Sequence, residues 1–340
     1  TGRALTQFRS HSSGRLTASL SSDQNVVLTV SDALRAFDVR EGSGTRGRTL
    51  LRVASTDLHQ TPLSDARFSP AHGDLRFLSC DQAGELGLWQ YRDGVLPQLL
   101  QRIPAGEQSV PTWAADSGIV NFVSQVAWRP DGQVFAGLQR GVLHCWSIGL
   151  QQSTVAGTAP LKAITLPLPA GLDCRFNDLT WSVDGTTLAA GGVAFREADA
   201  VLFSAACVWR VTADGARLVA VLQDDPENER IPATGSGEQP GGITAIALDA
   251  AGGRLLTGGV DARINTWLLP PLDAPADGNA DPDADAGDTR LERLKIWWGV
   301  QLEAPGLPAH DGRIIALCLH PDGHLASADT TGRLTLWPPR

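Results

Sequence analysis

The feature that most constrains the fold of this chain is a sequence unit that recurs six times and closes on an aromatic residue. Three copies align without gaps, and in each a turn glycine precedes the closing tryptophan by 14 residues: "DGQVFAGLQRGVLHCW" from Asp131, "GGRLLTGGVDARINTW" from Gly252 and "DGHLASADTTGRLTLW" from Asp322. Two copies with different loops close on Trp89 and Trp209, and a sixth closes on Phe37. Because an internal repeat changes the meaning of every residue within it, these units predict a repeat architecture.

Each unit contains four short extended segments. An alternating apolar run precedes the turn, as in "SQVAWRP" and "RIIALCL", and a further run follows the aromatic residue, as in "TLLRVAS" at 49–55 and "LKIWWGVQL" at 294–302. Four such strands are typical of a propeller blade, which cannot bury both faces alone and must stack on its neighbours. The 36 Gly, 21 Pro and 10 Trp also fit an all-β chain. We therefore expect an all-β propeller with six visible four-stranded blades in a single domain over residues 1–340, with seven blades possible if one lies outside this chain.

The two ends of the chain predict how the propeller closes. The extended run "RALTQFRS" at 3–10 has no strand partner before it, and the last unit stops after its third strand. Pairing the two segments would remove two exposed sheet edges at once. We therefore expect the N-terminal strand to complete the last blade.

Several motifs recur at fixed places within the units. The turns read "RPDG", "SVDG" and "HPDG", and a hydroxyl residue stands ten positions before the tryptophan at Ser79, Thr257 and Ser327. His310 precedes the first strand of its unit, and Asp261 lies six positions before Trp267. In these respects the units resemble WD40 repeats along essentially the whole chain.

The resemblance implies that His, Ser or Thr, Asp and Trp form a hydrogen-bonded frame within a blade. The residues that it assigns to such frames are His310, Ser327, Trp337, Thr257, Asp261, Trp267, Trp89, Trp146 and Trp209. No unit keeps all four members, since the last has Thr331 at the Asp position and the fifth has Gln239 where His is expected. We therefore expect degenerate repeats that depend mainly on strand pairing and on packing between blades.

The sequence points away from catalysis and from charged polymers as partners. His310 and Ser327 have no recognisable base or oxyanion donors around them, so no catalytic residues and no cofactor are predicted. A net charge of −9 repels phosphate backbones and anionic lipids, so neither nucleic acid nor a membrane surface is an expected partner.

Five cysteines without CxxC spacing indicate reduced thiols, with Cys145, Cys207 and Cys318 expected in buried strands. Together with the absence of a secretion signal in residues 1–20, they favour a cytoplasmic location. The start at Thr1 leaves open whether an upstream segment was removed.

An acidic insert at 270–290 offers a weak calcium motif. Asp281, Asp283, Asp285 and Glu292 stand at positions 1, 3, 5 and 12 of an EF-hand-type loop. Ala286 occupies the position where that loop requires Gly, and no helices flank the segment. The composition favours a solvated loop, with Ca²⁺ as the lesser alternative and no other metal site predicted.

Long loops at 103–122, 193–200 and 223–242 are expected on one face of the blades, and binding commonly concentrates on such loops. The candidate partner-binding residues are Trp113, Phe195, Arg196, Glu197, Arg230 and, on an outer strand, Trp298. Trp113 has the alternative of folding back over a blade. The resemblance implies a non-enzymatic scaffold or recognition module that holds protein partners, as part of a complex, with the oligomeric state left open.

Two alternatives remain for the function. One is a sensor or autoinhibitory propeller domain of a larger protein. The other is a propeller enzyme with a site at the mouth of the central channel, which would need carboxylates, histidines or metal ligands converging from several blades.

Overall fold

The computed structural model describes residues 17–31, 33–40, 43–44, 46–105, 124–148, 161–196, 201–212, 215–223, 242–249, 253–260, 262–269, 310–320 and 322–338. The chain divides into two compact units, which are described separately below: the first holds residues 1–108, 123–140 and 144–163, and the second holds 109–122, 141–143 and 164–340. Across the described residues the structure is built from strands, apart from the single-turn helix α1 (Ser55–Leu58).

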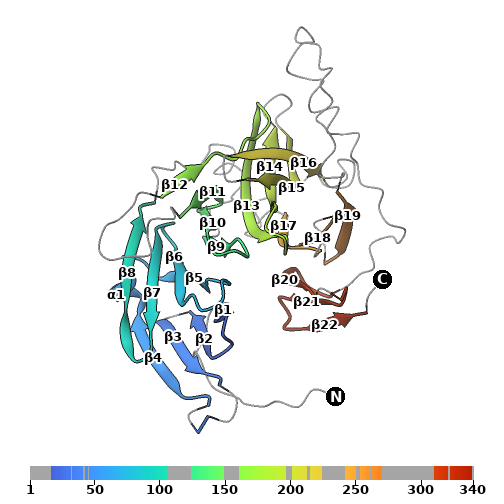
Figure 1. Ribbon diagram of the computed structural model, residues 1–340. Helices are drawn as coiled ribbons and strands as arrows, with labels where there is room; N and C mark the ends of the chain where they lie inside the picture. The colour runs from blue at the N-terminus through green and yellow to red at the C-terminus, as the bar shows by residue number, and fades with distance from the viewer. Residues whose placement is uncertain are drawn as a thin grey trace. The chain divides into compact units, whose positions relative to one another are not determined.

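The first unit contains three antiparallel four-stranded sheets, which are blades 1 to 3 (Figure 1). Blade 1 consists of β1 (Thr17–Leu20), β2 (Val26–Val30), β3 (Ala33–Asp38) and β4 (Thr49–Ala54). Blade 2 consists of β5 (Leu63–Phe68), β6 (Arg76–Asp81), β7 (Leu86–Arg92) and β8 (Val95–Ile103). Blade 3 consists of β9 (Gln125–Trp128), β10 (Val134–Gln139), β11 (Val142–Ser147) and β12 (Lys162–Ile164).

The second unit contains blades 4 to 6 (Figure 1). Blade 4 has four strands: β13 (Leu172–Trp181), β14 (Thr187–Arg196), β15 (Val201–Val211) and β16 (Ala216–Gln223). Blade 5 has β17 (Ile243–Leu248), β18 (Arg254–Gly259) and β19 (Ile264–Leu268). Blade 6 has β20 (Ile314–Leu319), β21 (Leu325–Asp329) and β22 (Leu334–Trp337).

These sheets confirm the predicted fold class, an all-β propeller with six blades in the described residues. Within each sheet the strands are paired in chain order, as expected when short turns connect antiparallel neighbours. The fourth strands expected at 294–302 and 3–10 lie outside the described residues. The closure by the N-terminal segment and the single-domain assignment over 1–340 therefore remain predictions.

The turns between the first and second strands of the blades follow directly from their sequences. In "RPDG" the Asp131 carboxylate accepts the backbone N–H of Gln133 at 2.9 Å, and in "SVDG" Asp184 accepts that of Thr186 at 3.0 Å. The glycines of these turns have φ values of 66° at Gly132 and 71° at Gly185, a region in which glycine carries no steric cost. The Asp–Gly pairs therefore set where each hairpin turns.

Adjacent blades are joined by carboxylates on their first strands. Asp65 of β5 accepts the backbone N–H of Val126 in blade 3 at 3.3 Å, and Asp178 of β13 accepts that of Ile246 in blade 5 at 2.8 Å. Each Asp directly follows a register shift of its strand. Such a bulge re-aims the side chain out of its own ladder and toward the neighbouring blade.

The core of each unit lies between facing blades. Leu34 of blade 1 packs in one buried cluster with Phe68, Phe77 and Tyr91 of blade 2. In the second unit a cluster joins Val208 of blade 4 with Ile246 and Trp267 of blade 5. Burial of one such side chain contributes roughly 1.5–3 kcal/mol, so stacking of blades is a principal source of stability.

The cysteines agree with prediction except at one position. Cys80, Cys145, Cys174 and Cys207 are buried free thiols, whereas Cys318, expected inside a strand core, is exposed. Its strand β20 is apolar throughout, but among the described residues only Ile314 of the strand is buried, and Ile315, Ala316 and Cys318 are exposed. In the part of the chain that the structure describes, no helix has the length and apolar character needed to cross a membrane.

Candidate functional site

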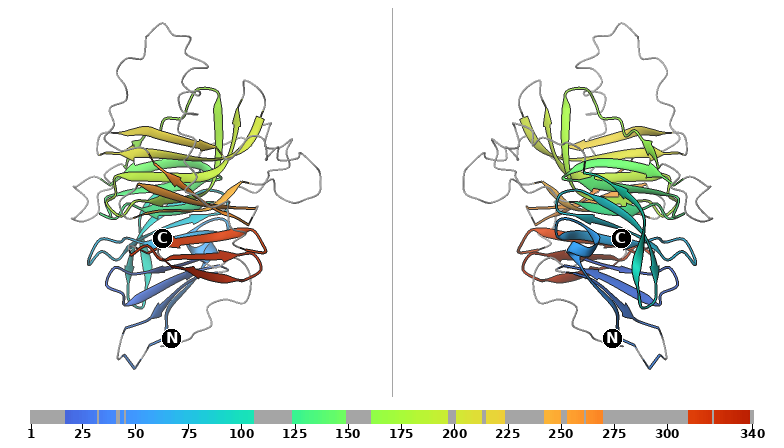
Figure 2. Two further views of the ribbon diagram at one scale, coloured as in Figure 1. Left: turned by 90° about the vertical axis from the view of Figure 1, so that its right-hand side faces the viewer. Right: turned by 90° about the vertical axis from the view of Figure 1, so that its left-hand side faces the viewer.

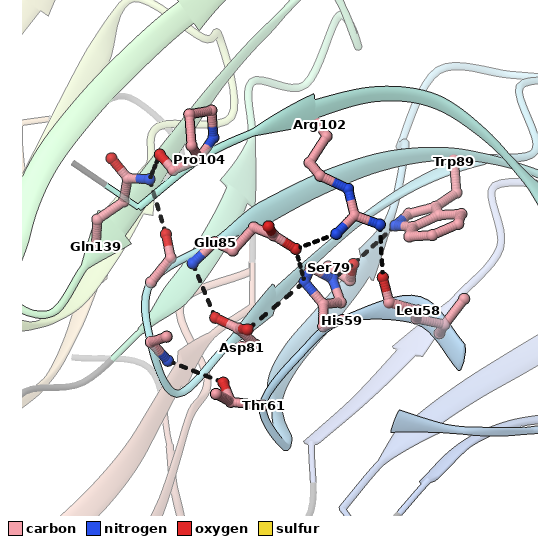
Figure 3. A network of polar contacts seen from close by, with 12 residues as sticks. Leu58, His59, Thr61, Ser79, Asp81, Glu85, Trp89, Arg102, Pro104 and Gln139 are labelled. Carbon is pink, nitrogen blue, oxygen red and sulfur yellow. Dashed lines mark hydrogen bonds and ion pairs between the residues drawn. The ribbon is translucent and has the colours of Figure 1, made fainter. Parts of the chain in front are cut away.

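Blade 2 contains a chain of buried polar side chains that begins at its tryptophan (Figure 3). Trp89 Nε1 of β7 donates to Ser79 Oγ of β6 at 2.8 Å, and Ser79 Oγ lies 2.6 Å from His59 Nε2. The other ring nitrogen, His59 Nδ1, lies 3.0 Å from Glu85 Oε1. Strand pairing positions this group, because Phe77 pairs with Trp89 and Ser79 follows two residues later on the same face of β6.

The donors and acceptors of this chain fit a neutral imidazole. Burial is the main cause that lowers the pKa of His59, although the carboxylates of Asp81 and Glu85 act in the opposite direction. An indole N–H can only donate, so the order that satisfies every group runs from Trp89 to Ser79, from Ser79 to His59 Nε2, and from His59 Nδ1–H to Glu85.

An arginine anchors the far end of the chain. Arg102 of β8 donates through Nη1 to Glu85 Oε1 at 2.7 Å and through Nη2 to the Leu58 carbonyl at 3.2 Å. The Glu85 side chain is 15% exposed and the Arg102 side chain is 40% exposed. The polar chain therefore runs from the blade core to the surface of the first unit (Figure 3).

Asp81 lies beside this chain with one oxygen unsatisfied. Its Oδ1 accepts the backbone N–H of Glu85 at 2.8 Å, while its buried Oδ2 has no hydrogen-bond partner among the described residues and lies 3.9 Å from His59 Nδ1. One ligand atom each from His59, Asp81 and Glu85 falls within 4.8 Å of the others, a group that could hold a metal ion. An unpaired buried carboxylate oxygen is costly, so its presence requires an explanation.

Sequence reasoning missed His59, Asp81 and Glu85. The signal for His59 was present, since Ser79 and Trp89 have the same ten-residue spacing as Ser327 and Trp337. The histidine stands 20 residues before its serine in blade 2 but 17 before it in blade 6. A search that allowed for three additional residues would have found it.

Blade 6 brings together His310, Ser327 and Trp337, the residues that the resemblance assigned to its frame. His310 Nε2 lies 2.6 Å from Ser327 Oγ, and Trp337 Nε1 donates to that oxygen at 2.8 Å. The expectation that Thr331 leaves the Asp position vacant is wrong, because Asp329 Oδ2 lies 2.9 Å from His310 Nδ1. Asp329 pairs across the sheet with Ile314 as Asp81 does with Leu63, and both carboxylates stand eight residues before their tryptophan, so a spacing of eight, not six, identifies them.

Thr331 instead supports that carboxylate. Its hydroxyl donates to Asp329 Oδ1 at 2.6 Å, and the backbone N–H of Arg333 donates to the same oxygen at 3.0 Å. These hydrogen bonds, with the Thr331 hydroxyl as the largest contribution, hold the pKa of Asp329 below its ordinary value. Both carboxylate oxygens of Asp329 thus have a hydrogen-bond partner, whereas in Asp81 only Oδ1 has one among the described residues.

The other assigned tryptophans are held in different ways. Trp267 Nε1 donates to Thr257 Oγ1 at 2.9 Å, while Asp261 lies outside the described residues. Trp209 Nε1 donates to the Pro167 carbonyl at 2.8 Å. Trp146 stacks on Phe135 with ring centroids 5.3 Å apart, and Gly137 leaves the room for its ring.

Two of the partner-binding candidates, Phe195 and Arg196, end strand β14. The interpretation of 193–200 as a loop insertion is wrong at its start, because residues 193–196 continue the strand and pair with residues 201–204 of β15. The Arg196 guanidinium lies 5.8 Å from the Phe203 ring centroid, and both candidates are half-buried. The remaining candidates lie outside the described residues: Trp113, Glu197, Arg230, Trp298, Asp281, Asp283, Asp285 and Glu292.

Comparison with known proteins supports the fold and nothing finer. No protein-family model matches the chain, and no curated protein matches it. Among solved structures, the β-propeller domain of Cps50 (Swd1) from Myceliophteria thermophila is similar, with a TM-score of 0.59 and 13% sequence identity over 98% of this chain and 86% of that one. The chain therefore shares a β-propeller fold with that domain.

Proposed function

We propose that the chain is a non-enzymatic interaction module that binds protein partners, in the manner of WD40-type scaffolds. The observation that carries the proposal is the length of the strands in blade 4. Strands β13, β14 and β15 have 10, 10 and 11 residues, whereas the strands of blade 6 have 6, 5 and 4. Figure 2 shows the long strands, in yellow-green, reaching beyond the other strands of their unit.

The extension is a paired strand structure that is partly buried. Leu172 to Phe176 of β13 pair with residues 192–196 of β14, which pair in turn with β15. Cys174, Phe176 and Ala194 are buried within this extension. A paired and partly buried strand loses little conformational entropy when a partner binds, in contrast to a free loop.

The residues at the end of the extension suit recognition of a protein. Phe195 and Arg196 belong to the residue types that dominate binding energy at interfaces. The Arg196 guanidinium is oriented by the Phe203 ring, an arrangement typical of a cation–π contact. We propose that this end of blade 4, called the blade 4 hairpin (residues 192–196 and 201–205), is part of the partner-binding surface. The cytoplasmic location remains a prediction.

Quantitative affinity purification from the native source tests the proposal. Proteins retained by the wild-type chain are compared with those retained by Phe195→Ala, by Arg196→Ala and by the control Leu96→Ala, whose side chain is 66% exposed on β8. We expect at least one protein to fall about tenfold or more in the two hairpin variants and to remain in the control, as for a hot-spot truncation. Equal retention of every protein by folded hairpin variants would reject the hairpin surface.

A further inference from the structure

We propose that His59, Asp81 and Glu85 of blade 2 form a binding site for a divalent transition-metal ion of the Zn²⁺ type. Each of the three residues offers one donor atom within 4.8 Å of the others (Figure 3). The atoms that face one another are His59 Nδ1, Glu85 Oε1 and Asp81 Oδ2. This site is independent of the blade 4 hairpin and of the proposed interaction function.

The separations of the donors fit a small ion. Ligands at about 2.1 Å from a tetrahedral Zn²⁺ are roughly 3.4 Å apart. His59 Nδ1 is 3.0 Å from Glu85 Oε1 and 3.9 Å from Asp81 Oδ2, so the two distances bracket that value. One imidazole and two carboxylates also match the donors that Zn²⁺ accepts, whereas Mg²⁺ and Ca²⁺ prefer oxygen alone.

The orphaned oxygen of Asp81 is the second observation that points to an ion. Asp81 is 1% exposed, and its Oδ2 faces His59 without a hydrogen bond from any residue that the structure describes. A bound cation would satisfy this oxygen. In blade 6, the corresponding Asp329 is fully satisfied by His310, Thr331 and Arg333.

Blade 6 shows the arrangement of histidine, serine and carboxylate in a blade where these residues form only a structural hydrogen-bonded frame. There the carboxylate contacts the histidine directly at 2.9 Å, and within the described part of the chain no second carboxylate takes part. In blade 2 the equivalent carboxylate stands 1.0 Å farther from the ring (3.9 against 2.9 Å), and Glu85 is added on the same nitrogen. A purely structural frame needs neither the longer carboxylate–histidine distance nor the added Glu85. A site with three donors around an ion needs both.

The surrounding residues allow the ion to replace the existing hydrogen bond. On binding, the ring proton moves from His59 Nδ1 to Nε2, so the imidazole stays neutral and no proton is released overall. Ser79 Oγ, 2.6 Å from Nε2, then accepts hydrogen bonds from both Nε2–H and Trp89 Nε1–H, and its own O–H no longer donates to His59. Arg102 keeps its contact with Glu85, and the partly exposed side chains of these two residues provide the way in.

Isothermal titration of the full chain with ZnCl₂, in a buffer without chelators, tests the site. Exposed donors elsewhere are removed first by Cys318→Ser and by His320→Asn and His324→Asn, since both histidines face Asp322 within 2.9 Å. Asp283→Ala in the same background removes a contribution from the acidic insert. We expect one Zn²⁺ per chain to remain bound and no comparable heat from MgCl₂.

Substitution of the ligands should weaken this binding at least tenfold. Glu85→Gln is the principal variant because its side chain is partly exposed, and Asp81→Asn is the second. Asp329→Asn, the equivalent change in blade 6, is the matched control and should leave Zn²⁺ affinity unchanged. Two results would overturn the proposal. One is loss of Zn²⁺ binding in the variant that carries Cys318→Ser, His320→Asn and His324→Asn, and the other is wild-type Zn²⁺ affinity in folded Glu85→Gln.

A second measurement separates metal binding from a purely structural role. Nitrogen-15 NMR of histidine-labelled protein reports the tautomer of His59, which is assigned by comparison with His59→Gln. We expect the Nδ1–H form without metal and the Nε2–H form with Zn²⁺, while His310 stays unchanged. An unchanged His59 tautomer at saturating Zn²⁺ would count against direct ligation.

Discussion

Blade 2 and blade 4 satisfy the indole N–H of a buried tryptophan with different hydrogen-bond acceptors. In both blades the third strand carries a buried tryptophan whose indole N–H needs an acceptor: Trp89 uses Ser79 Oγ, whereas Trp209 uses the Pro167 carbonyl. The residue of blade 4 at the position of Ser79 is Ala190, since each follows by two the strand residue that pairs with the tryptophan. The repeat thus conserves the satisfaction of the indole, not the residue that satisfies it.

The difference has a consequence for stability. Blade 2 concentrates its polar bonding in one buried side-chain network around His59. Blade 4 relies on long main-chain pairing, and its second strand is built from small residues, with Ala189, Ala190 and Gly191 buried in succession. Side-chain removal should therefore weaken blade 2 most, and backbone crowding should weaken blade 4 most.

The largest effect is expected from Gly192→Ala in blade 4. A Cβ at this position would collide with the Arg175 carbonyl oxygen and would lie 2.6 Å from Phe176 Cα, where the opposite strand bulges. Because these are backbone atoms that cannot move aside, we expect a loss of about 3 kcal/mol, measured by urea unfolding. Gly215→Ala, with nothing within 4 Å, is the control and should be nearly neutral.

Ser79→Ala in blade 2 should cost about 2 kcal/mol. The substitution leaves the Trp89 N–H and His59 Nε2 buried without a partner. Thermal unfolding of Ser79→Ala, Trp89→Phe and the double variant measures the coupling. We expect the combined loss to be smaller than the sum of the single losses, and strict additivity would show that the network does not act as a unit.

The reverse change, Ala190→Ser in blade 4, should not rebuild a frame. The Trp209 N–H already donates to the Pro167 carbonyl, so it is not available to the added hydroxyl. That hydroxyl would be buried without the indole as a hydrogen-bond partner. We expect a loss of about 1 kcal/mol in urea unfolding. A stabilised Ala190→Ser variant would mean that the hydroxyl competes successfully for the indole, and the contrast between the two blades would disappear.

Thr331→Val in blade 6 should give the smallest effect, visible mainly in acid. The Thr331 hydroxyl lowers the pKa of Asp329, so the folded state binds this proton less readily than the unfolded chain does. Stability from this source is present above the unfolded value of about 3.9 and is lost as the pH falls below it. The valine variant raises the pKa of Asp329 in the folded state, so the slope of melting temperature between pH 5 and 3 should become shallower than in the wild type.

The sequence allowed the fold to be predicted but only part of the polar networks. Blade number follows from the spacing between turn glycines and tryptophans, because that spacing is set by the length of a hairpin. Ser79, Thr257 and Ser327 were predicted from their common position ten residues before the tryptophan. Each of these hydroxyls accepts the indole N–H in its blade.

The missed residues lie at spacings that differ from the ones used to find the others. His59 directly follows α1, which lengthens the approach to blade 2 relative to blade 6. Asp329 and Asp81 each stand eight residues before their tryptophan, whereas a count of six back from Trp337 pointed to Thr331. The blade 4 hairpin was interpreted as a loop because the segment "READA" interrupts the apolar pattern from which strands are predicted. The residues on either side of it nevertheless belong to paired strands.

The directional order of the blade 2 network also carries an evolutionary consequence. Without a bound ion, Ser79 accepts the hydrogen bond of Trp89, which can only donate, and donates its own O–H to His59 Nε2. Loss of the serine alone leaves two buried groups unsatisfied, whereas loss of serine and histidine together leaves only one. In related chains we therefore expect positions 59 and 79 to change together. Blade 4, which has Ala190 at the serine position and the Pro167 carbonyl as acceptor, shows that the indole can be satisfied without the serine.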